Sequence, residues 1–155
     1  MNGHILNSVT ELISEKRNIV LIPHSSPDAD ALGSCLALYH FFKSKHEVNI
    51  ISPNEYTDIL NFLPGSENIL IYETDIEKCE NIFKNANLVF TLDFNSLGRA
   101  RNLSSFISKS SAKIVMIDHH ENPDNYADIT ISNSKMSSTC EMVYNFICSI
   151  DSSKI

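Results

Sequence analysis

Basic charge, paired cysteines and long apolar runs are scarce in this sequence, and each shortage excludes a class of protein. Acidic residues outnumber lysine and arginine, giving the 155 residues a net charge of −7. Long duplex nucleic acid needs a basic surface, so we expect no such partner. The four cysteines form no C-x-x-C pair, which favours reduced thiols over a disulfide or zinc framework.

The N-terminal segment lacks the apolar core of a signal peptide, and no apolar run has the length of a membrane span. We therefore expect a cytoplasmic protein with no membrane partner. Hydrophobic residues make up 43% of the chain, enough for one folded domain with its own core. An acidic protein can still bind phosphates where bound cations reverse the local field, so the motifs must decide whether cation ligands are present.

Short apolar runs alternate with helical patterns along the chain. Strands that alternate with helices and are apolar throughout indicate an α/β fold, with an open, mainly parallel sheet of Rossmann-like type covered by helices on both faces. A capping box, Ser138-x-x-Glu141, predicts the start of the last helix. We expect strands at 18–23, 47–52, 68–72, 87–93 and 113–118, and helices at 5–13, 31–43, 75–84 and 138–150.

Acidic and histidine residues follow the ends of three expected strands. They are His24, Asp28 and Asp30 after the first, Asp93 at the fourth and Asp118–His120 at the fifth. Because the carboxyl ends of parallel strands share one edge of a sheet, we expect these side chains to converge. Taken singly, each also fits an ordinary structural role: a loop histidine, a turn, a solvated loop, or an N-cap of the helix expected from Ala31.

Clustered carboxylates repel one another unless something neutralises them, and a pair of divalent cations would do so. Imidazole nitrogen mixed with carboxylate oxygen suits manganese, iron or zinc better than calcium. Two such ions can share a bridging carboxylate and hold the attacking and leaving oxygens of a phosphoryl group. Asp93, alone on the middle strand, is the expected bridge.

Four segments resemble motifs of the DHH phosphoesterase superfamily. His24–Ser34 (HSSPDADALGS) resembles its first motif, Asp93–Arg99 (DFNSLGR) its second, and Asp118–His120 the motif that names it. Ser137–Glu141 (SSTCE) is similar to a segment of the nano-RNase branch. The match covers nearly the whole chain in the family's order, and it implies the family's α/β fold and two divalent cations, with Mn²⁺ the favoured metal.

The resemblance also implies a role for each matching residue. One cation would be held by His24, Asp28 and Asp93, and the other by Asp30, Asp93 and His119.

Two further residues would be catalytic: His120 would contact the scissile phosphate, and Asp118 would orient its neighbours by hydrogen bonds. Arg99 is a candidate substrate contact because its guanidinium matches phosphate oxygens, although a surface ion pair fits it equally. Ser34, near a helix N-terminus, is a second candidate contact.

The sequence departs from the family pattern after the DHH segment. The family has a further metal-ligating aspartate and a glycine-rich substrate-binding domain there, whereas 35 residues follow His120 and the last of the four glycines is Gly98. We therefore expect residues 1–155 to form a single DHH metal-binding domain without the substrate-binding domain, and to be weak or inactive alone.

The function implied by the resemblance is metal-dependent hydrolysis of phosphoester bonds in very short RNA, in the manner of an exonuclease, or in adenosine 3′,5′-bisphosphate. The alternatives are an inorganic pyrophosphatase-like hydrolase and a non-catalytic module that binds metal or nucleotide. A small phosphorylated nucleotide is thus the expected partner, and a homodimer is left open.

Overall fold

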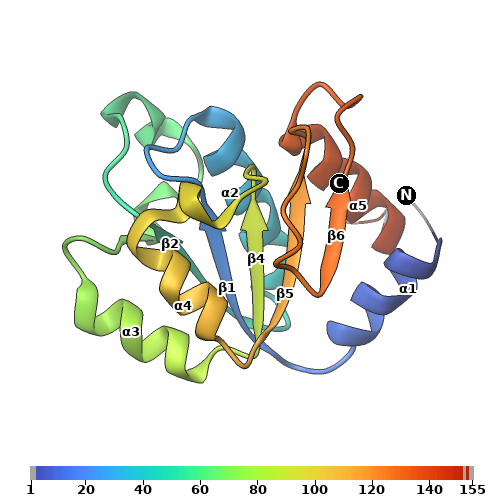
Figure 1. Ribbon diagram of the computed structural model, residues 1–155, viewed down its shortest axis with the longest axis horizontal. Coiled ribbons are helices and arrows are strands. Elements are labelled where there is room, and N and C mark those ends of the chain that lie inside the picture. The colour runs from blue at the N-terminus through green and yellow to red at the C-terminus, as the bar shows by residue number, and fades with distance from the viewer. Residues whose placement is uncertain (1–2, 152, 154–155) are drawn as a thin grey trace.

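The computed structural model describes residues 3–151 and 153 of the chain, so the outermost residues of the expected domain, 1, 2, 152, 154 and 155, lie outside it. Helices and strands alternate along the described part (Figure 1). The α-helices are α1 (Gly3–Leu12), α2 (Ala29–Phe42), α3 (Ile76–Asn85), α4 (Ser104–Lys109) and α5 (Thr139–Ile150). The strands are β1 (Asn18–Pro23), β2 (Glu47–Ser52), β3 (Ile69–Ile71), β4 (Leu88–Leu92), β5 (Lys113–Asp118) and β6 (Ile129–Ser132). Short 3₁₀ helices lie at Asp58–Phe62, Ser66–Asn68 and Leu97–Leu103.

The six strands form one sheet in the order β3-β2-β1-β4-β5-β6, and every neighbouring pair is parallel. This confirms the expected α/β fold with a parallel sheet. The order reverses between β1 and β4, which lie side by side although α2, two strands and α3 separate them in the chain. In such sheets the crevice at the carboxyl ends of the strands at this reversal is the usual ligand site.

Helices cover both faces of the sheet, and each face has its own hydrophobic core. Alternate residues of β1 divide between the two cores, because side chains along a strand point to opposite faces. Ile19 and Leu21 pack in the core beneath α1, α2 and α5, whereas Val20 and Ile22 pack beneath α3 and α4. A strand buried on both faces must be apolar throughout, which is why the sequence of β1 shows no alternation.

Several local predictions need correction. The strand β6 was not expected, because it is four residues long at the edge of the sheet and only Ile131 in it is buried. The helix α4 and the 3₁₀ turns before it were also not expected. The second helix begins at Ala29 rather than Ala31, so Asp28 is its N-cap and Asp30 lies in its first turn.

One of the two hydrogen bonds expected of the capping box at the start of α5 is present, and the other reaches a neighbouring residue. Ser138 Oγ accepts a hydrogen bond from the Glu141 N–H at 3.0 Å. The Glu141 carboxylate reaches one residue further back, accepting from the Ser137 N–H at 3.1 Å and from its hydroxyl at 2.6 Å. The start of the helix is therefore fixed from both sides, which matters because α5 begins at the candidate site.

Within the described residues, no helix combines the length and the apolar character that crossing a membrane requires.

Candidate metal centre

Asp93 lies at the carboxyl end of β4, where the strand order reverses. Its N–H donates to the Ile117 carbonyl of β5 at 3.1 Å, and its backbone then turns into the left-handed region with φ of 65°. Aspartate tolerates this conformation better than most residues. The turn leaves the carboxylate at the edge of the sheet with the residue only 2% exposed.

The two oxygens of the Asp93 carboxylate face two different histidines. Oδ2 lies 3.6 Å from His24 Nε2, and Oδ1 lies 3.6 Å from His119 Nε2. These separations exceed hydrogen-bond length. They fit atoms that share an ion, because two ligands bound at about 2.1 Å to one cation lie roughly 3–4 Å apart. One carboxylate is thus placed to serve two adjacent cations.

Both histidines direct Nε2, the nitrogen that would bind a cation, toward Asp93. His24 Nδ1 lies 2.8 Å from the Ser25 carbonyl, and His119 Nδ1 lies 3.3 Å from the Met136 carbonyl. A carbonyl oxygen can only accept, so in the neutral imidazole each Nδ1 carries the proton and each Nε2 keeps its lone pair. Histidines that bind metals commonly show this arrangement, since the hydrogen bond fixes both tautomer and ring orientation.

Asp28 and Asp30 approach the same place from the N-terminus of α2. Asp28 Oδ1 caps the helix by accepting from the Asp30 and Ala31 N–H groups, each at 3.0 Å, and lies 3.9 Å from His24 Nε2. Asp30 Oδ2 lies 3.7 Å from His119 Nε2. The structure therefore brings all five predicted ligands together at one edge of the sheet, divided between the two sides of Asp93.

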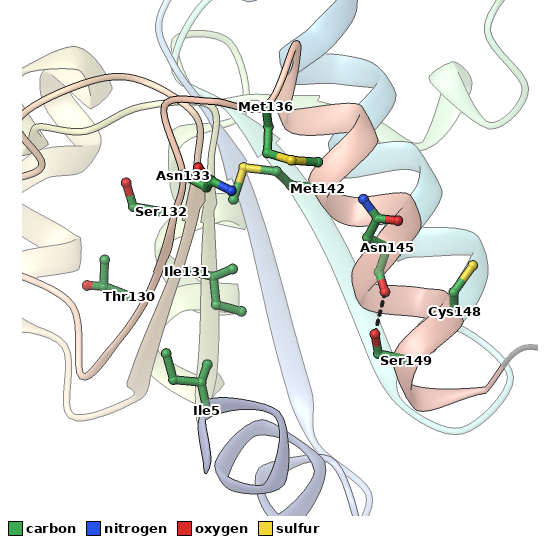
Figure 2. A pocket seen from close by; sticks show the side chains of 10 residues that line it. All are labelled: Ile5, Thr130, Ile131, Ser132, Asn133, Met136, Met142, Asn145, Cys148 and Ser149. Atoms are coloured by element: carbon green, nitrogen blue, oxygen red, sulfur yellow. Dashed lines mark hydrogen bonds between the residues drawn. The ribbon is translucent and has the colours of Figure 1, made fainter. Parts of the chain in front are cut away.

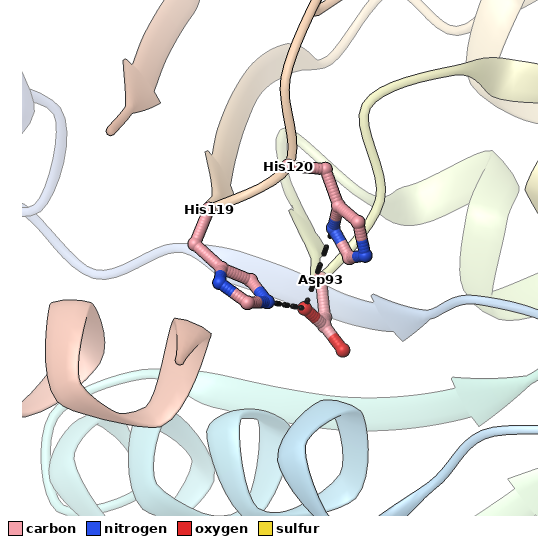
Figure 3. Close-up of side chains that lie close together, drawn as sticks. All are labelled: Asp93, His119 and His120. Carbon is pink, nitrogen blue, oxygen red and sulfur yellow. Dashed lines mark ion pairs between the residues drawn. The ribbon is translucent and has the colours of Figure 1, made fainter. Parts of the chain in front are cut away.

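His120 differs from the other two histidines, although its Nδ1 also lies 3.8 Å from Asp93 Oδ1 (Figure 3). That nitrogen is 2.7 Å from Oδ1 of Asp118, a fully buried carboxylate whose Oδ2 also accepts the His120 N–H at 3.0 Å. The other ring nitrogen, Nε2, faces Arg99, whose Nη1 donates to it at 3.3 Å. Because Asp118 occupies Nδ1, the nitrogen that His120 can offer to a substrate is Nε2, beside the Arg99 guanidinium.

The approach of His24 to Asp93 shifts the pKa values of both groups. Burial alone would lower the pKa of His24, but the facing Asp93 carboxylate and the Ser25 carbonyl outweigh it, so the pKa is raised. Burial alone would raise the pKa of Asp93, but His24 and the Thr139 hydroxyl outweigh it and hold that pKa below its ordinary value. Asp93 is thus an anion at neutral pH, as a cation ligand must be.

The donor chemistry fits a pair of divalent cations. Among the described residues, two groups of three have ligand atoms within 4.8 Å of one another: His24 with Asp28 and Asp93, and Asp93 with His119 and His120. The first is the predicted first set. In the second, His120 stands where we predicted Asp30, but Asp118 already engages its Nδ1, and Asp30 lies beside His119. Nitrogen with carboxylate oxygen suits manganese, iron or zinc.

Ser34, the other candidate substrate contact, has no exposed surface. It is fully buried in α2, and its hydroxyl faces Cys140 Sγ at 3.5 Å. A side chain without exposed surface cannot contact a phosphate, so Ser34 acts in packing between α2 and α5.

One residue at the centre was missed by sequence reasoning. Thr139 is fully buried, and its hydroxyl donates to Asp93 Oδ1 at 2.7 Å. The sequence offered a signal in the serine-threonine segment, but the capping box accounts for that segment equally well.

The predicted metal ligands do not line the large cavity that the structure contains. A cavity of about 580 Å³ lies between α1, β6 and α5, with Ile131, Met136 and Met142 along its wall (Figure 2). The described residues that line it include no histidine, aspartate or glutamate, so the predicted ligand types are not found there.

Comparisons with known proteins bear on the family and the fold of this chain. The sequence model described as the DHH family, N-terminal domain, matches residues 18–155. The bifunctional oligoribonuclease and PAP phosphatase NrnA of Bacillus subtilis is 32% identical over 139 residues, which cover 87% of this chain and 40% of that protein. The crystal structure of an exopolyphosphatase-related protein from Bacteroides fragilis superposes with a TM-score of 0.95 at 38% identity, covering 98% of this chain and 45% of that one.

A more distant structure shares the fold alone. RecJ from Thermus thermophilus, solved in complex with Mn²⁺, superposes with a TM-score of 0.59 at 11% identity, covering 99% of this chain and 22% of that one. The chain thus spans less than half the length of each of these relatives.

Proposed function

The chain belongs to the DHH family, and from that premise we propose that it is the metal-binding domain of a phosphoesterase that uses two divalent cations, with Mn²⁺ the favoured metal. The proposed substrates are very short oligoribonucleotides, adenosine 3′,5′-bisphosphate, or both. The relative NrnA, which is named for both activities, supports this choice over the pyrophosphatase alternative.

The observation that carries the proposal is the position of Asp93 between two histidines. Its Oδ2 faces His24 and its Oδ1 faces His119, at 3.6 Å each. We assign His24, Asp28 and Asp93 to one cation, and Asp30, Asp93 and His119 to the other. When bound, such a pair activates a water molecule and neutralises the charge that develops on a phosphoryl group.

The remaining residues would act on the substrate. His120, with Nδ1 held by Asp118, would present Nε2 to the scissile phosphate, and the Arg99 guanidinium beside it would contact phosphate oxygens. Asp118 would keep His120 in this tautomer, as a buried carboxylate does for a catalytic histidine in other hydrolases. The acidic chain supplies few other cations here, so the metal pair would provide most of the attraction for an anionic substrate.

A hydrolysis panel in the presence of Mn²⁺ tests the proposal. We expect slow release of mononucleotide from a diribonucleotide, of phosphate from adenosine 3′,5′-bisphosphate, or of both, and none from pyrophosphate. The rate should be low because the chain spans less than half the length of each of the relatives it matches. The matched control is Asp93→Ala, which should abolish the activity.

Each other outcome contradicts a defined part of the proposal. Cleavage of pyrophosphate alone would support the pyrophosphatase alternative. Binding of Mn²⁺ with no turnover of any substrate would support a non-catalytic metal-binding module. Turnover that persists in Asp93→Ala would contradict the assignment of Asp93 to the metal centre.

A further inference from the structure

We infer that Thr139 is a positioning residue that fixes the bridging carboxylate of the metal pair, an inference that rests on the proposed function. The Thr139 hydroxyl donates to Asp93 Oδ1 at 2.7 Å across 46 residues of sequence, and Thr139 is fully buried. A carboxylate oxygen has two lone pairs. The hydroxyl takes one on Oδ1 and leaves the other for the cation on the His119 side.

Thr139 also hydrogen-bonds Asp30, the other carboxylate that we assign to the second cation. The Thr139 N–H donates to Asp30 Oδ2 at 2.8 Å, and the Cys140 N–H donates to Asp30 Oδ1 at 2.7 Å. The first turn of α5 thus hydrogen-bonds both carboxylates that we assign to the second cation. Because the backbone amides and the hydroxyl belong to one rigid turn, the two carboxylates are held in a fixed relation to each other.

These hydrogen bonds reduce a repulsion between carboxylates that exists before a cation binds. Asp30 and Asp93 are both acidic, and without a cation between them they repel each other. Hydrogen bonds from the α5 terminus partly neutralise both groups and fix the rotamer of Asp93 before binding. A preorganised ligand loses less conformational freedom on binding, so the hydroxyl should raise cation affinity rather than only stabilise the fold.

The inference is tested by Mn²⁺ titration calorimetry of Thr139→Val, which keeps the branched shape and removes the hydroxyl. We expect an affinity at least about tenfold weaker than that of the unmodified protein, as is typical when a hydrogen-bond partner of a metal ligand is lost. Thr139→Ser, which keeps the hydroxyl, should restore most of it. If Thr139→Val does not fold, the pair Thr139→Ser and Thr139→Ala makes the same comparison, because the two differ essentially in the hydroxyl.

Thr91→Val is the matched control. Thr91 is also fully buried, and its hydroxyl makes a 2.9 Å hydrogen bond to the Tyr126 hydroxyl rather than to a ligand carboxylate. Its loss should lower stability while Mn²⁺ affinity stays unchanged.

The outcomes separate this inference from the proposed function. Equal Mn²⁺ affinity in the unmodified protein and Thr139→Val would overturn the role of Thr139 and leave the metal centre intact. An equal loss of affinity in Thr139→Val and Thr91→Val would also overturn it, because the loss would then follow from general destabilisation. An unmodified protein that binds no Mn²⁺ would contradict the proposed function and the inference with it.

Discussion

Ionisable side chains lie at both ends of the sheet, but the distances between them differ from one end to the other. At the amino end of β5, Lys113 Nζ and Asp128 Oδ1 close to 2.6 Å, and Asp128 Oδ2 accepts the Ile114 N–H at 2.9 Å. At the carboxyl end, His24 and His119 stay 3.6 Å from the Asp93 oxygens. Lys113 and Asp128 thus form a direct ion pair, whereas the histidines and Asp93 stand too far apart for direct hydrogen bonds.

The difference separates a structural pair from a site prepared for a ligand. Asp128 is partly exposed, and its ion pair needs nothing further. Asp93 is buried and has a left-handed backbone. Its carboxylate accepts a hydrogen bond from Thr139 and faces His24 and His119, so three other segments surround it. Strain and near-contact of ionisable groups at one edge are features that functional sites share.

The largest difference between the two ends should appear when the same substitution is made at each. Asp93→Asn removes a charge and a ligand oxygen, so Mn²⁺ affinity measured by titration calorimetry should fall by more than about 100-fold, beyond the loss typical of an outer hydrogen-bond partner. Asp128→Asn should leave that affinity unchanged, and equal affinities in the two variants would show that the two ends do not differ in this way.

Cation binding should stabilise the protein through the carboxyl end alone. At a free Mn²⁺ concentration one hundred times Kd, the free energy of unfolding should rise by about 2.7 kcal/mol for one site. Thermal unfolding with Mn²⁺ and with a chelator measures the gain. Asp128→Asn should show the same gain as the unmodified protein and Asp93→Asn little of it, and a gain that persists in Asp93→Asn would place the cation elsewhere.

The smallest effect is expected at the amino end. Asp128→Asn should lower the free energy of unfolding by about 0.5–1 kcal/mol at neutral pH, because the Lys113 side chain is 59% exposed and solvent screens the pair. Lys113 and the Ile114 N–H hold the pKa of Asp128 below its ordinary value. A lowered pKa contributes stability above the unfolded value, near 3.9, and the contribution is lost as the pH falls through the folded value.

Denaturant unfolding of the unmodified protein and Asp128→Asn between pH 7 and pH 2.5 checks this dependence. The difference between the two should be constant down to about pH 5 and shrink below pH 4. A difference that grew on acidification would contradict the assigned ion pair.

Much of the fold could be predicted because parallel strands buried on both faces leave a strong signal. The inner residues of β1 and β5, Ile19–Ile22 and Ile114–Ile117, are all apolar, and both strands were predicted with their observed bounds. The meeting of His24, Asp93 and His119 also followed from one rule, that the carboxyl ends of parallel strands share an edge.

The rest depended on contacts between distant segments, which a single sequence does not record. β6 is short, lies at the edge and is partly exposed, so its pattern is weak. Ser34 resembled a substrate contact because it follows a helix N-terminus, but α5 packs over it. Thr139 reads as part of a capping segment until the fold brings it to Asp93. Local signals predicted the elements, and tertiary packing decided what their side chains touch.

The central claim is that Asp93 bridges two cations, and anomalous diffraction from crystals grown with Mn²⁺ tests it most directly. We predict two anomalous peaks, one near each carboxylate oxygen at about 2.0–2.3 Å, with His24 completing one coordination sphere and His119 the other. A map in which Asp93 contacts one peak or none would contradict the account.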